Sequence, residues 1–418
     1  MPKLITSLAA SVCVLISVSA QAGQAPVNLP DGPGEPLVQQ ICTQCHGLNQ
    51  IVNSSGYTRE HWKELIGNMA DLTGSPQQLD TVTQYLATNF PPNTRRAPTP
   101  VAGDVKITVT SWKVPKLGQR ARDPVMTPDG MIWWAGQFGN VVGRLDPKTG
   151  AMKEYELPAG ARPHSITPDA AGNIWYTGNA NGTIGRIDAK TGEIKVYPMP
   201  DPAAKDPHTA EFDRKGTLWF TVQNSQMIGK LVPATGEIKL VKVPTPDSNP
   251  YGIKVDAAGA LWVACSESNC ILKVDPETMA IREFKLPPRS TVRRIAFASD
   301  GMLWYGNSGL GSVGRLDPKT GATKEWPSPS GPASDPYGFE VVNDVVWYNE
   351  SGKRPDMLVR FDPKTEKFQS WPIQSGNIYA GIVRHMRSTP NGDLLIHQSA
   401  TNHIMRVSID DGRKQVAR

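Results

Sequence analysis

The sequence predicts two unlike folds in series, a small all-α domain followed by an all-β propeller of seven blades. Tryptophans recur at nearly constant spacing through the second part of the chain. A proline-rich stretch separates this part from a short segment whose apolar residues follow helical spacing. At 418 residues the chain is long enough for a small domain joined to one large β unit.

The repeat unit begins with Asp-x-x-Gly-x-(Leu/Ile)-Trp and continues, after a variable loop, into Gly-Arg-Leu-Asp-Pro-Lys-Thr-Gly and an alternating strand. Its tryptophans are 42 to 44 residues apart, at Trp133, Trp175, Trp219, Trp262, Trp304 and Trp347. A seventh, degenerate unit follows at 391–396. Four short strands in a period of about 42 residues are typical of one propeller blade.

The seven units predict a propeller over residues 105–410, with a tail at 411–418. The seventh unit ends near Ile409 after its third strand, whereas residues 105–114 alternate like an outer strand. We therefore expect this N-terminal strand to complete the seventh blade and remove an open sheet edge. Because the tryptophans recur in every blade, we expect them to pack between blades.

Residues 1–22 have the pattern of a signal peptide. Lys3 supplies a positive charge, Leu4 to Val18 form an apolar run, and Ala20-Gln21-Ala22 is a small-x-small cleavage site. We expect cleavage after Ala22 and a periplasmic or secreted protein. An uncleaved membrane anchor is the alternative, although the run is short for a span. We expect no later segment to cross a membrane.

Charge does not indicate a nucleic-acid partner. Lys and Arg number 44 against 39 Asp and Glu, and the basic residues are spread along the chain. A nucleic-acid footprint would be a clustered basic patch. The overall charge therefore does not identify a binding partner, and the sequence motifs have to indicate one.

The stretch Ile41–Gly47 contains two cysteines, Cys42 and Cys45, separated by two residues and followed at once by His46. This spacing is typical of c-type haem attachment, in which both thiols bond to the haem vinyl groups and the histidine ligates iron. A zinc site would need a second ligand pair, which the remaining cysteines do not supply. The motif predicts one covalent haem c.

Helical spacing predicts three short helices. The first begins at Glu35 and carries the haem cysteines, the second begins at Thr58, and the third runs over about Pro76–Phe90. The motif Cys-x-x-Cys-His, followed by Trp62-x-x-Leu65-x-x-x-Met69 and Tyr85-Leu86-Ala87-x-x-Phe90, resembles the small cytochrome c domains fused to or associated with periplasmic oxidoreductases.

This resemblance implies a cytochrome c domain over residues 23–90 with Met69 as the distal iron ligand. Such a ligand raises the reduction potential and favours electron transfer. His61 is the rival ligand, and the iron is five-coordinate if neither side chain binds it. Residues 91–104 should form an extended, rather stiff linker.

Candidate residues on the propeller are those that break the repeat at the loops entering the innermost strand and between the second and third strands. The first set is Arg122, His164, His208, Tyr251, Arg294, Tyr337 and His385. The second set is Gln137, Asn179, Gln223, Glu267, Asn307, Glu350 and His397. Four of the seven histidines fall into these sets, which indicates a site. The catalytic candidates are His164, His208, His385, Arg294, Glu267 and Glu350.

The units also resemble the streptogramin (virginiamycin B) lyase family of seven-bladed propellers over nearly all of residues 105–410. The resemblance implies histidines at the inner-strand entries of neighbouring blades, acids that bind magnesium, and elimination of the ester link of a cyclic peptide. His164 and His208 occupy such positions. The segments 175–178 and 219–222 lack the expected acid, which a hard cation prefers. Glu211, Glu267 and Glu350 remain as substitutes.

Cys265 and Cys270 flank a four-residue loop between two strands of one blade. Facing positions on such a hairpin suit a disulfide, and an exported protein meets an oxidising environment. We expect this disulfide to stiffen the loop that carries Glu267.

Three functions fit these observations. The first is an exported haem c oxidoreductase component whose propeller binds a substrate or donor and whose electrons pass to a redox partner protein or respiratory acceptor. The second is a magnesium-dependent lyase or hydrolase on the propeller. The third is a non-catalytic ring that presents a cytochrome to a partner. The haem motif favours the first function.

Overall fold

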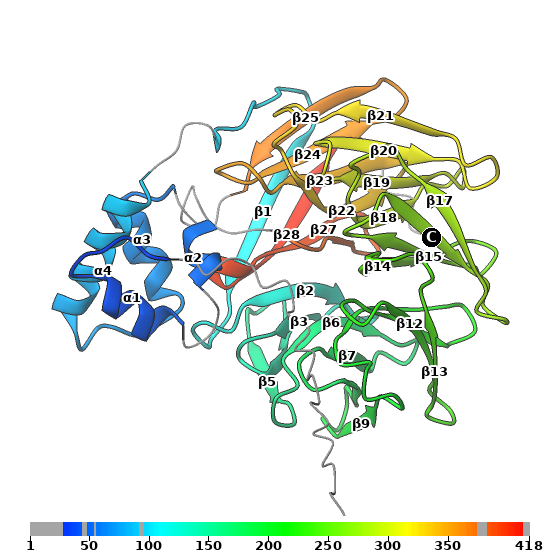
Figure 1. The fold of residues 1–418 in the computed structure, drawn as a ribbon, viewed down its shortest axis with the longest axis horizontal. Coiled ribbons are helices and arrows are strands. Elements are labelled where there is room, and N and C mark those ends of the chain that lie inside the picture. The colour runs from blue at the N-terminus through cyan, green and yellow to red at the C-terminus, as the bar shows by residue number, and fades with distance from the viewer. Residues whose placement is uncertain (1–27, 44–47, 54–55, 92–95, 374–382, 413–418) are drawn as a thin grey trace, which may run out of the picture.

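The computed structural model describes residues 28–43, 48–53, 56–91, 96–373 and 383–412. The expected signal peptide, Cys45, His46 and most of the tail lie outside these residues. Figure 1 shows a helical unit beside a ring of seven β-sheets. No helix in the described ranges combines the length and apolar character that a membrane crossing requires.

The helical unit has four described helices, one more than the sequence pattern predicted. They are α1 (Glu35–Cys42), α2 (Leu48–Asn53), α3 (Arg59–Gly67) and α4 (Pro76–Asn89). The additional helix α2 is too short to produce a periodic pattern. Thr58 caps α3, because its hydroxyl oxygen accepts a hydrogen bond from the His61 amide at 3.3 Å.

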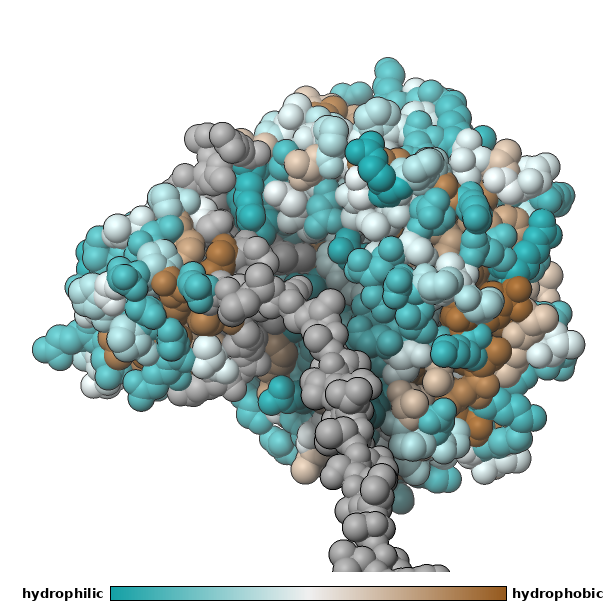
Figure 2. All heavy atoms as spheres, in the orientation of Figure 1, coloured by the Kyte–Doolittle hydropathy of each residue, from teal (hydrophilic) through white to brown (hydrophobic). Residues whose placement is uncertain are grey.

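One apolar cluster holds these helices together. Its buried members include Val38 of α1, Trp62 and Leu65 of α3, and Val82 and Leu86 of α4. Figure 2 shows apolar side chains of this unit on the side that faces the propeller. The small domain thus has its own core, although its helices are short.

The strands of the propeller follow one another outward from the axis in each blade. Blade one has β2 (Ala121–Met126), β3 (Ile132–Gly136), β4 (Val141–Leu145) and β5 (Met152–Glu156). Blade two has β6 (Pro163–Pro168), β7 (Ile174–Gly178), β8 (Thr183–Ile187) and β9 (Ile194–Pro198). Blade three has β10 (Pro207–Phe212), β11 (Leu218–Val222), β12 (Met227–Val232) and β13 (Glu237–Lys242).

The next three blades repeat this order. Blade four has β14 (Pro250–Val255), β15 (Leu261–Cys265), β16 (Cys270–Val274) and β17 (Ile281–Lys285). Blade five has β18 (Val292–Phe297), β19 (Leu303–Asn307), β20 (Ser312–Leu316) and β21 (Thr323–Pro327). Blade six has β22 (Pro336–Val342), β23 (Val345–Glu350), β24 (Met357–Asp362) and β25 (Lys367–Pro372).

Blade seven combines both ends of the propeller. It contains β26 (Arg387–Ser388), β27 (Leu394–Gln398), β28 (His403–Asp410) and the N-terminal strand β1 (Lys106–Lys113). β1 pairs antiparallel with β28 from Lys106 opposite Asp410 to Lys113 opposite His403. This pairing gives the last blade its fourth strand and closes the ring.

The repeated tryptophans lie in the interior, as their recurrence predicted. In several blades the indole N–H donates to the aspartate that begins the motif, as from Trp175 to Asp169 at 3.0 Å. An aromatic ring of the outer strand stacks on the tryptophan, as Tyr197 does on Trp175. These contacts recur from blade to blade and are structural.

The repeated glycine of the Gly-Arg-Leu-Asp motif has a packing reason. In the third strand it lies beneath the aromatic residue that follows the tryptophan. A Cβ atom at Gly185 would lie 2.0 Å from Cζ of Tyr176, and one at Gly143 would lie 1.9 Å from Cζ2 of Trp134. Close packing leaves no room for a side chain there.

The described part of the linker lies against blade six. The Val101 carbonyl accepts a hydrogen bond from the Ser370 amide at 2.9 Å, and the Gln369 side chain donates to the Val105 carbonyl at 2.8 Å. The Arg354 amide donates to the Arg96 carbonyl at 2.8 Å. The sequence predicted an extended linker but not its attachment along β25.

Candidate functional site

The register of the innermost strands defines the positions around the propeller axis. In each blade one inner-strand residue pairs with the repeated tryptophan, or with Leu395 in blade seven. These residues are Val125, Thr167, Glu211, Lys254, Ala296, Glu340 and Arg387. Three positions earlier lies the upper ring, Arg122, His164, His208, Tyr251, Arg293, Tyr337 and Arg384. Two positions earlier lies the second ring, Asp123, Ser165, Thr209, Gly252, Arg294, Gly338 and His385.

The first predicted set mixes these two rings. Arg294 and His385 belong to the second ring, and the upper-ring positions in their blades are Arg293 and Arg384. In blades one to six the inner-strand register shifts just after its entry. Such a bulge changes the residue count along a strand without a mark in the sequence. Because this bulge is shared, it does not displace one of these blades against another. Arg293 lies as far before Trp304 as His164 lies before Trp175. The predicted set therefore places Arg294 and His385 one residue too late, which the spacing to the second strand reveals.

An arc of aromatic rings runs over part of the upper ring. The imidazole centroids of His164 and His208 are 3.6 Å apart, and the Tyr251 ring lies 4.0 Å from His208. The Tyr251 hydroxyl is hydrogen-bonded to that of Tyr337. The structure thus brings together His164 and His208, which the sequence predicted as neighbours, and extends their surface with two tyrosines.

Asp123 and His385 form a buried pair at the axis. The Oδ2 atom of Asp123 lies 3.0 Å from Nδ1 of His385, and its Oδ1 atom lies 3.4 Å from Nε of Arg122. Burial opposes the charged carboxylate, but His385 and Arg122 hold the pKa of Asp123 well below its usual value. Asp123 was not among the predicted residues, although it lies next to Arg122 and breaks the repeat.

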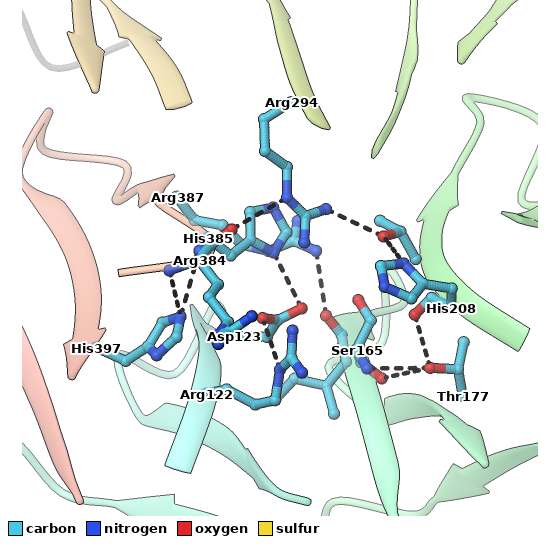
Figure 3. A network of polar contacts seen from close by, with 12 residues as sticks. Arg122, Asp123, Ser165, Thr177, His208, Arg294, Arg384, His385, Arg387 and His397 are labelled. Carbon is cyan, nitrogen blue, oxygen red and sulfur yellow. Dashed lines mark hydrogen bonds and ion pairs between the residues drawn. The ribbon is translucent and has the colours of Figure 1, made fainter. Parts of the chain in front are cut away.

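Guanidinium groups surround this pair (Figure 3). Nε of Arg294 donates to the Arg384 carbonyl at 3.2 Å, and its Nη1 donates to the Thr209 hydroxyl at 3.0 Å. Nη1 of Arg122 donates to the Gln137 side chain at 2.9 Å. Arg387 contacts Glu211 at 3.3 Å. The centre of the ring is therefore rich in positive charge.

The axial histidines are neutral at ordinary pH. Burial lowers the pKa values of His164, His208 and His385 well below the usual value. Repulsion from Arg294 acts in the same direction on all three, with Arg122 adding to it at the first two and Arg387 at His385. A buried neutral imidazole both donates and accepts a hydrogen bond. These side chains can therefore hold or move a proton, but they do not add charge to the cluster.

The two tyrosines respond in opposite ways to their surroundings. Burial raises the pKa of Tyr251 to about 12. Burial acts in the same direction on Tyr337, but the guanidinium groups of Arg384 and Arg293 outweigh it and lower its pKa to about 8. The Arg293 guanidinium lies 4.8 Å from the centre of the Tyr337 ring. Of the two hydroxyls, that of Tyr337 therefore loses its proton first as the pH rises.

His397 supports the chain that enters blade seven. Its Nε2 atom accepts hydrogen bonds from the main-chain amides of Arg384 and His385, both at 3.2 Å. Burial lowers the pKa of His397 to about 3. Because its ring nitrogens are engaged, including Nδ1 with Ser399 at 3.1 Å, His397 is a positioning residue.

The two predicted acids do not join the axial cluster. Glu267 is exposed in the loop between β15 and β16. Glu350 is fully buried in blade six, where it accepts hydrogen bonds from the Ser328 hydroxyl at 2.7 Å and the Ser330 amide at 2.9 Å. Glu211 is paired with Arg387. No group of three or more His, Cys, Asp or Glu side chains within the described ranges could hold a metal ion. The residues therefore do not fit the expected magnesium site.

The remaining members of the second set have local structural roles. Asn179 donates to the Pro207 carbonyl at 3.1 Å, and Asn307 donates to Ser290 at 2.9 Å. The Gln223 amide donates to the Asp206 carbonyl at 3.4 Å. Of this set, Gln137 contacts the axial cluster through its side chain. Cys265 and Cys270 form the expected disulfide, with their Cα atoms 5.5 Å apart.

The described part of the haem motif lies at the core of the helical unit. Cys42 ends α1, Met69 follows α3, and both half-buried side chains pack against the same apolar cluster. Burial raises the pKa of the Cys42 thiol to about 11. The indole N–H of Trp62 is buried without an acceptor among the described residues. His61 is half-buried on the same helix.

A hydrogen-bonded bridge joins the helical unit to the propeller. The Asn68 carbonyl accepts from the Asn402 side chain at 2.7 Å and from the Gly118 amide at 2.9 Å. The side-chain oxygen Oδ1 of Asn402 accepts a hydrogen bond from the Ala121 amide at 3.5 Å. Ala121 precedes Arg122 of the upper ring. The residue before Met69 is thus joined to the strand that enters the axial cluster.

Fold and site together define a seven-bladed β-propeller with a polar, guanidinium-rich cluster on its axis. The model of the virginiamycin B lyase family matches residues 102–274 and 237–416, and the chain belongs to this family. No curated protein matches the chain.

Several solved structures share the fold. A streptogramin B lyase has 24% sequence identity and a TM-score of 0.65, over 73% of this chain and 98% of its own. Virginiamycin B lyase from Staphylococcus aureus has 24% identity and a TM-score of 0.65, over 72% and 99%. Hydrazine synthase from Kuenenia stuttgartiensis has 13% identity and a TM-score of 0.58, over 70% and 95%. At these identities the likeness concerns the fold.

Proposed function

We propose that the protein is an exported electron-transfer component, with one covalent haem c in its helical domain and a substrate or partner site at the propeller axis. The observation that carries this proposal is the sequence Cys42-Thr-Gln-Cys45-His46 on a helical unit joined to the propeller. Bound haem c supplies reversible one-electron chemistry. The acceptor would be a redox protein or a respiratory component.

The described residues of the helical unit fit such a group. Cys42 and Cys45 would form the covalent bonds, and His46 and Met69 would ligate the iron. Cys42 and Met69 pack on one apolar cluster. A buried N–H group ordinarily has an acceptor, and the unpartnered indole of Trp62 would find one in a carboxylate of the bound group. His61 is the alternative axial ligand.

The bridge through Asn402 supports a joint role for the two domains. It holds the turn before Met69 against the loop that leads into Arg122. A ligand at the axis and a group in the helical domain would therefore be coupled through a short path. The signal sequence at residues 1–22 supports a periplasmic or secreted location, where haem c attachment takes place.

Expression with a signal peptide and a c-type maturation system tests this function. The purified protein should show a reduced-minus-oxidised haem spectrum and should gain the mass of one haem. The matched variant Cys42→Ala/Cys45→Ala should export normally but lack the covalent haem. A correctly exported wild-type protein without reducible haem absorbance would contradict the proposal.

A second candidate is a lyase or hydrolase activity on the propeller. Family membership and the Asp123–His385 pair favour it, because a neutral imidazole oriented by a carboxylate can act as a general base. This activity would be lost in His385→Ala or His208→Ala and retained in Met69→Ala. Inhibition by a chelator would show dependence on a divalent metal, for which the described acids are poorly placed.

A further inference from the structure

We propose that the axial cluster binds an oxyanion, a carboxylate or phosphate group of a small ligand, through the guanidinium groups of Arg122 and Arg294. This inference deepens the proposed function by naming the chemistry of the propeller's ligand. It rests on that function in one respect, that the axis is the ligand-binding part of the propeller.

The first argument is the balance of charge at the axis. Guanidinium groups outnumber carboxylates there. Arg122, Arg294, Arg384 and Arg387 meet only Asp123 and Glu211. Arg387 is paired with Glu211, and Asp123 is shared between His385 and Arg122. Around this cluster Lys254 is paired with Glu340 and Arg293 with Asp335, whereas Arg120 adds a further positive charge beside Arg384 and Arg122.

The second argument is that each of these guanidinium groups has a buried nitrogen without a hydrogen-bond partner in the described part of the chain. In Arg384 and Arg387 it is Nε. Nη2 of Arg122 and Nη2 of Arg294 are buried and have no hydrogen-bond partner in the described part of the chain. The two residues are only 1% and 3% exposed. Buried charged donors almost always have acceptors, so these two indicate a missing acceptor. Nδ1 of His164, which is 6% exposed, is a further unpartnered polar atom beside them.

The third argument is that these side chains are held in place before any ligand arrives. The other nitrogens of Arg294 donate to Thr209 and to the Arg384 carbonyl. Arg122 is held by Gln137 and Asp123. Figure 3 shows both guanidinium groups beside Asp123 at the centre of the ring. A planar guanidinium fixed in this way offers its remaining N–H groups to an oxyanion with little loss of entropy.

The surroundings favour a small organic anion over a cation. No group of carboxylates or imidazoles in the described ranges could hold a metal ion. The aromatic arc of His164, His208 and Tyr251 lies beside the arginines and offers ring faces to an unsaturated or aromatic ligand. The burial of the cluster excludes a macromolecular surface from direct contact with these donors.

Isothermal titration of the full-length, haem-loaded protein with benzoate and with inorganic phosphate tests this inference. Benzamide is the matched neutral probe. We expect saturable binding of at least one of the two anions, none of benzamide, and displacement of benzoate by phosphate if both bind. Binding of benzoate alone or of phosphate alone identifies the oxyanion. No saturable binding of either anion, or equal binding of benzamide and benzoate, would overturn the proposal.

Two variants localise the site. Arg294→Gln should weaken anion binding by about tenfold or more, because it removes a charged donor. Arg282→Gln, which changes an exposed arginine of the outer strand β17, should bind like the wild type. Unchanged binding in Arg294→Gln would also overturn the proposal. If Arg294→Gln does not fold, Arg122→Lys takes its place in this binding comparison. The wild-type comparison of benzoate with benzamide depends on neither variant.

These outcomes are separate from those of the haem test. Titration heats do not depend on redox activity. A protein that carries haem but binds neither anion would contradict this inference alone. A protein that binds the anion but never acquires haem would contradict the electron-transfer function alone.

Discussion

The side-chain amide of Asn402 donates to the main-chain carbonyl of Asn68 at 2.7 Å, and this contact joins blade seven to the helical domain. In blades one and four the side-chain N–H of the equivalent asparagine donates to the end of the outer strand of its own blade, from Asn140 to the Leu157 carbonyl at 2.9 Å and from Asn269 to the Leu286 carbonyl at 3.0 Å. Blade seven has kept the residue and redirected its side chain. The domain contact is therefore a modified propeller turn.

This contact predicts a specific effect of Asn402→Ala. Loss of a buried hydrogen bond should cost about 1 kcal/mol, and loss of an asparagine at φ 56° adds to it. Amide exchange of residues 67–70 should increase, because the Asn68 carbonyl keeps only the Gly118 amide. The reduction potential of the haem-loaded protein should also shift.

Asn140→Ala is the matched control for this prediction. Asn140 has φ 54° at the same turn position but makes its hydrogen bonds within the propeller. It should lose similar stability without faster exchange at 67–70. Equal exchange in both variants would mean that the bridge does not hold the turn before Met69.

Substitution of the two candidate distal ligands, His61 on α3 and Met69 just after it, tests which one binds the iron. A thioether ligand raises the reduction potential of haem iron, so Met69→Ala should lower it. His61→Ala should leave it nearly unchanged. Potentiometric titration of the two variants decides between the residues, and the opposite result would identify His61 as the ligand.

Acid should destabilise the propeller before its carboxylates titrate. Burial lowers the pKa values of His164, His208 and His385, and lowers that of His397 to about 3. Below a pH of about 6.5 the unfolded chain binds protons that these folded imidazoles do not bind. The free energy of unfolding should therefore fall with decreasing pH, by about 1.4 kcal/mol per pH unit for each histidine.

One buried acid opposes this trend. Burial raises the pKa of Asp356 to about 7, so the folded protein binds a proton there that the unfolded chain lacks between pH of about 4 and 7. Asp356 thus offsets one of the histidines. Urea unfolding at pH 7.5, 6.5 and 5.5 measures the net slope of the free energy of unfolding against pH. His397→Asn should reduce this slope, because one fewer proton is taken up when the chain unfolds in acid. A flat profile over this range would contradict the prediction.

The glycine beneath the aromatic ring in blades one, two, three and five predicts a stability effect. Gly185→Ala would place a Cβ atom 2.0 Å from Tyr176, and such overpacking costs about 1–3 kcal/mol or more. Gly67→Ala is the control, because no atom lies within 4 Å of its added Cβ and alanine favours a helix. Urea unfolding should show a loss for the first variant and no loss for the second. A Gly185→Ala variant as stable as the wild type would show that the blade can repack.

The sequence by itself determined the architecture of the propeller. Six blades carry the same tryptophan, and four of them also carry the glycine beneath the neighbouring aromatic ring. The same local packing in each blade requires the same residues, so the pattern repeats along the chain. The alternating strand at 105–114, the cysteine pair Cys265 and Cys270, and the neighbouring His164 and His208 could be read in the same way. These features depend on residues near one another in the chain.

The tertiary structure alone decided which side chains meet at the axis. Asp123 pairs with His385 from 262 residues away, and Glu350, a plausible ligand by position, turns inward to Ser328 and Ser330. Arg294 lies in the second ring, where it donates to the Arg384 carbonyl of blade seven. Asn402 reaches Asn68 because ring closure and domain packing bring them together. Contacts between distant segments leave no periodic signal, so the sequence could point to the face of the site but not to its partners.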